Sequence, residues 1–373
     1  MALTKDEELY IDIANPHTKK KFELIEEYVK GWAPKLLGYK KCDGVVFIDC
    51  MCNRGVYHNN NGEEVFGTPI RVANVLSDIM KNYPAKEAWL YFNDLSEEKT
   101  EVLKTYLPSS TDNFHIIVRS GDGNDELRKI ASNPPKKLNI NYLVFYDPYT
   151  ASIDWMALRP FLKKWGEVII NHMVSDSIRG VPQAKREITK ERYEMTYLAS
   201  IEELASLGSD RKAYEERIQK IMMGGVPDKR YFIASFPFFN TKNALIYNLI
   251  HGSSNIEGFK LFKKLAWKTF GGKSSSKNTH GNKNTQLVFD GFGGTRKNTD
   301  NYCYDIQDIA HYLHSKFIGR ENVSLQDIWR VLDEHPVFPS DGFRQEIKEC
   351  LKKTYNDVVS NTTITFTDMR SLA

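Results

Sequence analysis

The sequence predicts an α/β fold in which a doubly wound, mostly parallel sheet is followed by a small second domain. Short apolar and β-branched runs recur between residues 45 and 250 and alternate with helix-like stretches. A continuous apolar run such as residues 45–48 is typical of a strand buried on both faces of a parallel sheet. Beyond residue 270 the composition changes, which indicates a second structural unit.

The expected strands and helices follow one another along the chain. An amphipathic helix is predicted at 17–32, because apolar residues recur there at spacings of three and four. Strands are predicted at 45–48, 88–92, 114–118, 142–146, 167–171, 231–235 and 244–250. Helices are predicted between them at 70–80, 97–106, 126–131 and 155–164. This alternation predicts βαβ units, and the last two strands are expected to form an antiparallel hairpin.

The domain organisation follows from shifts in composition. Residues 1–270 are expected to form the main domain, with a helical insertion at about 183–225, where both charges are frequent. Residues 271–300 are dense in Gly, Ser, Asn and Lys and predict a flexible basic linker. Residues 301–373 give three helix signals, in which Ser324 is expected to cap 325–333 and Ser340 or Asp341 to cap 343–353. These helices and an alternating end favour a winged-helix-like domain. A plain helical interaction module is the alternative.

Composition narrows the class of protein. The 51 Lys and Arg residues against 48 Asp and Glu residues leave a net charge of +3, so bulk charge does not indicate a polyanionic partner. The five cysteines are too few and too irregular for a disulfide framework. The sequence shows no signal-like start and no apolar stretch long enough to cross a bilayer. We therefore expect a cytoplasmic protein without a membrane partner.

Three candidate sites stand at the carboxyl ends of predicted strands, where open α/β sheets bind ligands. The first strand is followed by DCMCNRG at 49–55, in which Gly55 suits a tight turn close to a nucleotide-like cofactor. Asp94 follows the second strand and is suited to accept both ribose hydroxyls, or to cap the next helix. Asp122 follows the third strand and is suited to bond an adenine amine, or to form an ordinary turn.

The fourth strand end carries the sequence DPY at 147–149. It places an acid, a rigid turn and an aromatic face at one point, which suits a planar, amine-bearing substrate held by hydrogen bonding and stacking. Asp147 and Tyr149 are therefore candidate catalytic residues. The structural alternative is a strand that simply ends at Asp-Pro.

These motifs resemble the three-Cys-motif partner (TcmP) family, which is methyltransferase-like. The resemblance covers most of residues 15–270, and its motifs are the following: His17-Thr18 with Lys21, residues 49–57 in place of the family's D-G-F-A-G-x-G-x-Y, 67–69 for its G-S-P, 147–149 with Trp155, 168–179, and 245–267. The resemblance implies a Rossmann-like sheet of the class I S-adenosylmethionine-dependent methyltransferases. It also implies association with a cysteine-motif protein that looks radical-enzyme-like.

The resemblance also assigns residues to a cofactor site. It implies that S-adenosylmethionine lies against Asp49, Gly55, Asp94 and Asp122, with Asp147 on the acceptor side. Cys50 and Asn53 belong to the same turn and complete our predicted cofactor-binding set: Asp49, Cys50, Asn53, Gly55, Asp94 and Asp122. Asn53 departs from the family, because it replaces a glycine. Asn tolerates a positive φ better than most residues, so we expect the turn to survive.

Two functions remain open on sequence. The first is a methyltransferase that acts on nucleic acid or together with the radical-enzyme-like partner. The second is a noncatalytic scaffold on a degenerate methyltransferase fold, which binds nucleic acid or a partner protein. Nucleic acid is expected at the basic linker and at four bases of the C-terminal domain, Arg344, Lys348, Lys352 and Lys353.

Other chemistries have less support in the sequence. The three-glycine fingerprint of dinucleotide oxidoreductases is missing, and no catalytic triad order, Walker loop or H-E-x-x-H motif occurs. The cysteines at 42–52 lack the paired C-x-x-C spacing of zinc sites, and the His and Cys residues at 303–314 are explained by a helix face. We therefore predict no metal site.

Overall fold

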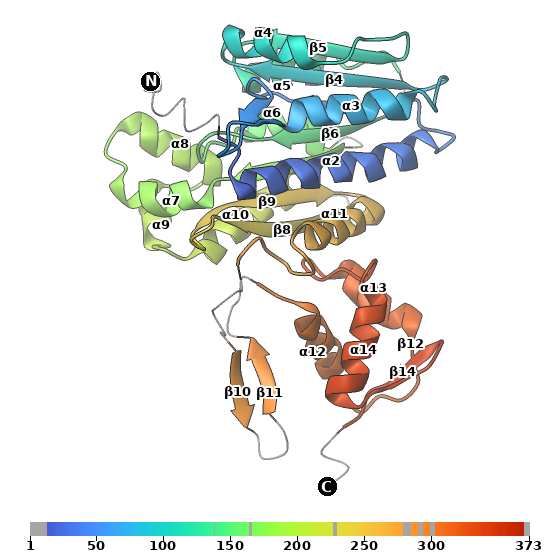
Figure 1. Cartoon of the computed structure of the whole chain (residues 1–373). Helices are drawn as coiled ribbons and strands as arrows, with labels where there is room; N and C mark the ends of the chain where they lie inside the picture. The colour runs from blue at the N-terminus through green and yellow to red at the C-terminus, as the bar shows by residue number, and fades with distance from the viewer. Residues whose placement is uncertain are drawn as a thin grey trace.

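The computed structural model of the chain describes residues 13–137, 139–163, 166–226, 230–278, 285–289, 294–298 and 303–368. Its centre is a seven-stranded sheet (Figure 1). The strands are Gly44–Asp49 (β1), Glu87–Asp94 (β4), Phe114–Ser120 (β5), Ile140–Tyr146 (β6), Gly166–His172 (β7), Phe232–Phe239 (β8) and Leu245–Ser253 (β9). Their order across the sheet is β5-β4-β1-β6-β7-β9-β8.

Strand directions confirm the doubly wound, mostly parallel sheet. β1 pairs in parallel with β4 on one side and with β6 on the other, so the strand order reverses beside β1. β9 runs antiparallel to both β7 and β8, which confirms the predicted hairpin of the last two strands. The carboxyl end of β1 is therefore the switch point at which such sheets bind ligands.

Helices cover both faces of the sheet. Alternate residues of β1 therefore belong to two separate hydrophobic clusters. Val45 and Phe47 face one cluster, and Val46 and Ile48 face the other. The first cluster lies under Pro16–Leu37 (α2), Thr68–Met80 (α3), Glu97–Tyr106 (α4) and Ile256–Thr269 (α11). The second lies under Gly123–Ser132 (α5) and Trp155–Lys163 (α6).

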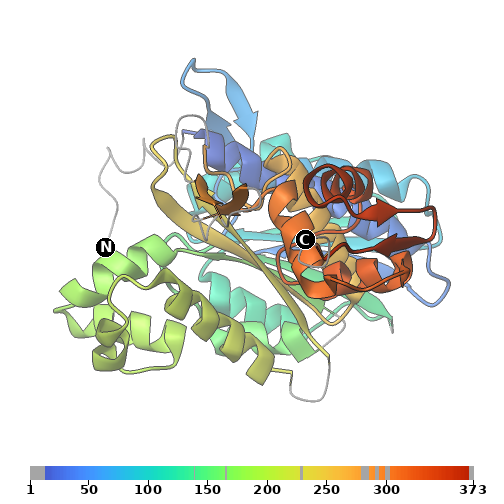
Figure 2. The same cartoon turned by 90° about the horizontal axis from the view of Figure 1, so that it is seen from below.

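The insertion between β7 and β8 is helical, as predicted. Its helices are Val174–Gly180 (α7), Glu187–Tyr197 (α8), Ile201–Ser206 (α9) and Arg211–Gly224 (α10), with a short 3-10 turn at Val181–Gln183. The indole N–H of Trp155 donates to the carbonyl oxygen of Thr196 at 2.8 Å, which fixes α8 beside the segment that follows β6. The insertion thus borders the carboxyl edge of the sheet and is light green at the left of Figures 1 and 2.

The C-terminal part contains three helices and a small antiparallel sheet, and it packs below α11 (Figures 1 and 2). Its elements are Ile306–Phe317 (α12), Val323–Ser324 (β12), Leu325–Glu334 (α13), Arg344–Tyr355 (α14), Val358–Val359 (β13) and Thr363–Thr365 (β14), with the sheet order β12-β14-β13. Three helices and a terminal β element agree with the expected content. The winged-helix-like assignment itself stays a prediction.

The prediction of a flexible linker at 271–300 was wrong for part of that segment. Ser274, Ser275 and Ser276 are buried. The backbone N–H of Phe239 donates to the hydroxyl of Ser276 at 2.7 Å, which ties the segment to edge strand β8. Two further strands, Thr285–Phe289 (β10) and Gly294–Asn298 (β11), form a hairpin. This segment is rich in Gly and Ser, yet the hydroxyl of Ser276 bonds to a sheet edge.

A small hairpin, Val56–His58 (β2) with Glu64–Phe66 (β3), was not predicted and follows the turn after β1.

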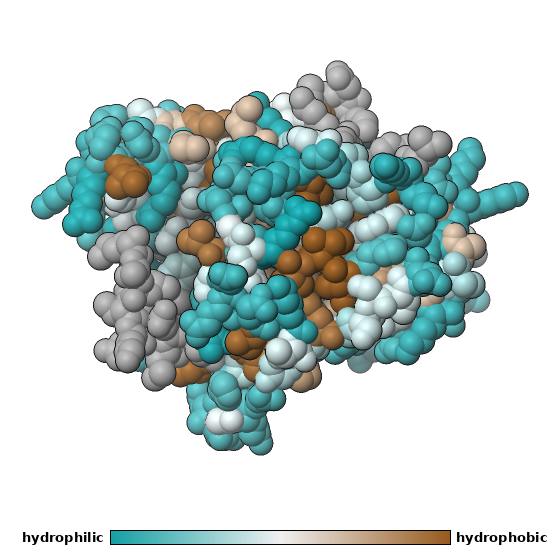
Figure 3. All heavy atoms as spheres, turned by 90° about the horizontal axis from the view of Figure 1, so that it is seen from above, coloured by the Kyte–Doolittle hydropathy of each residue, from teal (hydrophilic) through white to brown (hydrophobic). Residues whose placement is uncertain are grey.

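On the side of the molecule toward β5 and α4, most of the surface is hydrophilic, with scattered apolar areas of which the largest lies near the middle (Figure 3). In the part of the chain that the structure describes, no helix combines the length and the apolar character that a membrane span requires.

Candidate functional site

The turn after β1 keeps a shape suited to a close approach of a ligand. Asp49 is the last residue of β1, is buried, and accepts a hydrogen bond from the backbone N–H of Met51 at 3.2 Å. Asn53 and Gly55 both have positive φ, +55° and +73°. A Cβ on Gly55 would lie 2.7 Å from Cδ1 of Leu103, so glycine is required there. Asn53 thus adopts the left-handed conformation that we expected at the position where the motif of the three-Cys-motif partner family has a glycine.

Asp94 connects this turn to the end of β4. Its Oδ2 accepts the backbone N–H of Asn53 at 2.9 Å, and its Oδ1 accepts that of Ser96 at 3.1 Å. The N-cap of α4 is Ser96, whose hydroxyl accepts from the N–H of Lys99, so Asp94 is not the helix cap. A carboxylate can accept about four hydrogen bonds, so Asp94 retains capacity for ribose hydroxyls.

The end of β5 packs directly against the turn after β1. Asp122 is the N-cap of α5, and its side chain accepts from the backbone N–H groups of Asn124 and Asp125. A Cβ on the next residue, Gly123, would lie 2.5 Å from the carbonyl oxygen of Cys50. The cap function of Asp122 is a structural role, and its exposed position at the rim leaves it accessible to a ligand.

Asn93 is a residue of this site that the sequence analysis missed. Its side-chain amide donates to the carbonyl oxygens of Cys50 at 3.2 Å and Gly121 at 2.9 Å. Its own carbonyl oxygen accepts the N–H of Cys52 at 2.9 Å. The Oδ1 atom of Asn93 is buried without a partner among the described residues. Asn93 therefore joins three strand ends, and the sequence signal for it is a polar residue directly after the apolar run 88–92.

Asp147 lies at the same edge, just beyond the end of β6, and two side chains hold it. The ammonium group of Lys21, near the start of α2, lies 2.6 Å from Oδ2. The amide of Asn171, near the end of β7, donates to Oδ1. Lys21 also lies 5.4 Å from the ring centroid of Tyr247, where a cation–π attraction operates. Sequence motifs contain Lys21 and Asn171, but only the tertiary structure reveals these contacts.

The electrostatics of this edge favour a positively charged ligand. Burial, and then the negative charge of Asp147, raise the pKa of Asp49. Burial, and then the charge of Lys21, lower the pKa of His17 to about 4. Two acids thus lie together in a partly buried site, and one of them, Asp49, has no lysine or arginine bonded to it among the described residues. A cation near Asp49 would favour its ionised form.

The remaining predicted residues separate into two groups. Cys50 and Cys52 are buried, and burial raises the pKa of both thiols, so they act as small packed residues. Tyr149 is 62% exposed and does not join the buried cluster around Asp147. Within the described ranges, no group of three or more His, Cys, Asp and Glu residues is placed to hold a metal ion.

No protein-family model and no curated protein matches the sequence. Solved structures with a similar fold include protein LPL1258 from Legionella pneumophila, with 14% identity, 67% of this chain and 91% of that chain covered, and a TM-score of 0.41. Human methyltransferase-like protein 13, solved in complex with SAH, has 9% identity, 66% and 91% coverage, and a TM-score of 0.33. Identities and TM-scores this low carry no information about activity.

An O-methyltransferase from Bacillus cereus, also solved in complex with SAH, has 10% identity, 61% of this chain and 80% of that chain covered, and a TM-score of 0.31. These similarities concern the α/β sheet alone. The resemblance to the three-Cys-motif partner family stays a prediction.

Proposed function

We infer that the protein is an S-adenosylmethionine-dependent methyltransferase whose acceptor is a planar, amine-bearing group. The observation that carries this proposal is the convergence of four strand ends at the switch point of the sheet. Hydrogen bonds join the turn after β1 to Asp94 and, through Asn93, to the turn after β5. Asp147 lies across from them and is close enough to raise the pKa of Asp49.

The donors and acceptors of this edge fit S-adenosylmethionine. Asp94 would accept the ribose hydroxyls, Asp49 would face the amino group, and Asp122 would accept from the adenine amine. A Cβ at Gly121 would meet nothing within 4 Å, so the backbone there faces open space. The cofactor, when bound, supplies an electrophilic methyl group.

The acceptor side is built for positioning. Lys21 and Asn171 each bond one oxygen of Asp147, which fixes the plane of the carboxylate. Each oxygen keeps a second lone pair that can accept from an amine of the acceptor. The exposed ring of Tyr149 lies two residues further on and offers a stacking face. Such an arrangement accelerates transfer mainly by holding the reacting atoms in line.

Calorimetric titration of the full chain with S-adenosylmethionine and with its demethylated product tests the proposal. We expect both ligands to bind, and Asp94→Asn to weaken binding by about tenfold or more, because each lost 1.4 kcal/mol is a factor of ten. Asp78→Asn is the matched control, because its side chain is 75% exposed on α3. If neither ligand gives a heat of binding at millimolar concentration, the proposal of a methyltransferase is rejected, and the noncatalytic scaffold remains as the alternative.

Nucleic acid is our proposed source of the acceptor, and α14 is the element that supports it. Arg344, Lys348 and Lys352 recur every four residues along this helix. Residues 303–368 nevertheless hold seven Lys and Arg against eleven Asp and Glu, a net charge of −4, so the support lies in the placement of these bases and not in net charge. Fluorescence anisotropy with DNA and RNA should show an affinity that falls with salt. If binding to both DNA and RNA is absent or insensitive to salt, the proposal of a nucleic-acid acceptor is rejected.

The resemblance to the three-Cys-motif partner family adds a second proposed partner, a radical-enzyme-like protein with a cysteine motif. Co-expression of such a protein with this chain should give a complex that survives gel filtration. Elution of the two chains as separate species would reject the proposal of this partner and would not affect the proposal of a methyltransferase site.

A further inference from the structure

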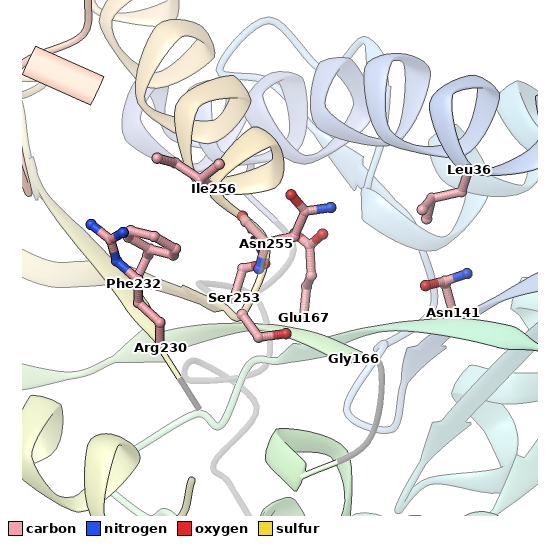
Figure 4. A pocket seen from close by; sticks show the side chains of 10 residues that line it. Leu36, Asn141, Gly166, Glu167, Arg230, Phe232, Ser253, Asn255 and Ile256 are labelled. Atoms are coloured by element: carbon pink, nitrogen blue, oxygen red, sulfur yellow. Dashed lines mark hydrogen bonds between the residues drawn. The ribbon is translucent and has the colours of Figure 1, made fainter. Parts of the chain in front are cut away.

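Two adjoining pockets lie at the amino edge of the sheet, opposite to the candidate methyltransferase site. One has a volume of about 650 Å³ and the other of about 530 Å³, sizes typical of small-molecule sites. Both are lined by the same four residues, Leu36, Asn141, Glu167 and Asn255. In Figure 4 the side chain of Glu167 stands between Asn255 on one side and Leu36 with Asn141 on the other.

Glu167 brings a nearly buried carboxylate to the base of both pockets. Its side chain is 11% exposed, and its Oε2 accepts hydrogen bonds from the hydroxyl of Tyr28 and from Nε2 of His251, the latter at 2.8 Å. Tyr28 and His251 are fully buried behind it. Burial, and then the charge of Glu167, raise the pKa of Tyr28, so this phenol stays a neutral donor.

His251 contacts Glu167 through one ring nitrogen. Its Nδ1 is buried without a hydrogen-bond partner among the described residues, whereas its Nε2 donates to Glu167. Tyr28 and His251 are thus both donors to the same carboxylate oxygen.

Three cationic side chains, Lys35, Lys41 and Arg230, line the pockets, and two of them lie beside other acids. Lys35 lies 3.8 Å from Glu257, and Arg230 lies 2.7 Å from Glu334. Among the described residues, no lysine or arginine forms an ion pair with Glu167, whose one basic neighbour is the ring of His251. A nearly buried carboxylate that borders solvent-reaching pockets without a lysine or arginine partner is a charge that a bound cation would compensate.

We propose that these pockets bind a small organic cation, in the form of a planar amidinium or guanidinium on an apolar body. A planar fork of N–H donors matches the two oxygens of a carboxylate such as Glu167. The apolar side chains of Leu36, Phe232 and Ile256 provide walls for the body of the ligand. This site is separate from the proposed methyltransferase function and does not depend on it.

Benzamidine and benzamide form the probe pair, because they share a shape and differ in charge. Calorimetry on the full chain should show benzamidine binding at least tenfold more tightly than benzamide. Equal affinities of the two compounds would overturn the proposal, because the carboxylate would then contribute nothing to recognition.

Two variants locate the binding. Glu167→Gln keeps the acceptor for Tyr28 and His251 but removes the charge, and it should abolish the preference for benzamidine. Leu36→Trp places a bulky ring on the wall shared by both pockets and leaves the Glu167 hydrogen bonds in place, so it should weaken benzamidine binding even where Glu167→Gln fails to fold. Glu101→Gln, at a side chain 59% exposed on α4, is the control that should bind as the parent chain does.

Benzamidine binding that survives Leu36→Trp unchanged would overturn the proposal. Titration of each variant with the demethylated product of S-adenosylmethionine should match the parent chain, because the two sites lie at opposite edges of the sheet. Failure of that product to bind the parent chain would reject the proposed function and leave the cation site standing.

Discussion

Asp49 is the single residue on which the proposed cofactor site depends most. It is an acid buried at the switch point, and the neighbouring charge of Asp147 adds to burial in raising its pKa. The amino group of the cofactor would favour the ionised form instead. Binding should therefore release a proton, and affinity should rise with pH through the raised pKa of Asp49.

Calorimetry with the demethylated product between about pH 5 and pH 8 tests this linkage. His17 stays neutral over that range, because its pKa is lowered to about 4, and so it adds no titration of its own. Asp49→Asn should bind more weakly and without the pH dependence. A pH-independent affinity in the parent chain would contradict the assignment of Asp49.

The raised pKa of Asp49 also has a consequence for folding. This pKa is higher in the folded than in the unfolded protein, so the contribution of Asp49 to stability is present at acid pH and is lost as pH rises. Asp49→Asn should therefore unfold at a higher temperature than the parent chain at neutral pH, because asparagine removes a carboxylate whose ionised form is disfavoured by burial. A lower melting temperature of Asp49→Asn than of the parent chain at neutral pH would show that other groups of the protein already compensate the charge of Asp49.

At the scale of elements, the close packing of β-strand ends is the property that makes a site. Gly123 begins α5 against the turn after β1, and a Cβ there would meet the carbonyl oxygen of Cys50 at 2.5 Å. Gly123→Ala must push these two elements apart, so we expect a loss of about 2 kcal/mol in stability, typical of overpacking, together with weakened cofactor binding.

Gly224→Ala is the matched control for that change. Gly224 lies in α10, where a Cβ would meet nothing within 4 Å, so alanine should leave the stability unchanged or raise it by up to about 1 kcal/mol. Denaturant unfolding of both variants gives the comparison. Equal stability of Gly123→Ala and the parent chain would show that the two strand ends are not packed as described.

The sequence was sufficient to predict the seven sheet strands, because each contains a short apolar run. The end of β8 was wrong: residue 235 was expected, but the strand continues to Phe239 through Pro237, which an edge strand tolerates. The sequence also predicted Ser324 as the cap of α13, and the hydroxyl of that serine accepts from the N–H of Asp327. The start of α14 was wrong: Phe343 precedes the helix without a side-chain cap, whereas Ser340 or Asp341 was expected. Such boundaries depend on tertiary packing, which a local pattern does not contain.

The candidate site was predictable only in part, for the same reason. Asp49, Asp94 and Asp147 follow strands directly, so their common edge can be read from the sequence. The partners of Asp147 come from the start of α2 and the end of β7, and nothing in local sequence joins those segments. Asn93 offered one usable signal, because a polar side chain follows the apolar run 88–92 directly.

At the scale of the whole molecule, one lysine joins the main domain to the C-terminal part. The ammonium of Lys263, on α11, lies 2.7–3.1 Å from four backbone carbonyl oxygens, which share its three N–H donors: those of Leu332, Asp333, His335 and Phe338. Burial lowers the pKa of Lys263 to about 7. The carbonyl oxygens oppose that effect, because they favour the charged ammonium.

Lys263→Met should remove the ammonium donor from all four carbonyl oxygens, of which that of Leu332 keeps the backbone N–H of His335. We expect a loss of about 2–4 kcal/mol, because bonds to charged groups are stronger than neutral ones, and faster proteolysis between the two parts. Lys268→Met, at an exposed position of the same helix, should change neither property. Cleavage of Lys263→Met at the rate of the parent chain would show that Lys263 does not hold the C-terminal part in place.

Two elements run between the two proposed ligand sites. α2 carries Lys21, which bonds Asp147 at the carboxyl edge, and Tyr28, which bonds Glu167 near the amino edge. β7 likewise carries Asn171, which bonds Asp147 at the carboxyl edge, and Glu167, which bonds His251 near the amino edge. A shift of either element would change contacts at both edges of the sheet.

The central claim is that the four strand ends form an S-adenosylmethionine site, and a crystal structure of the chain with the demethylated product tests it most directly. We expect the ribose at Asp94, the adenine beside Gly121 and Asp122, and the amino-acid end at the turn from Asp49 to Gly55. A complex in which the ligand lies elsewhere, or crystals grown at saturating ligand that show none at this edge, would contradict the claim.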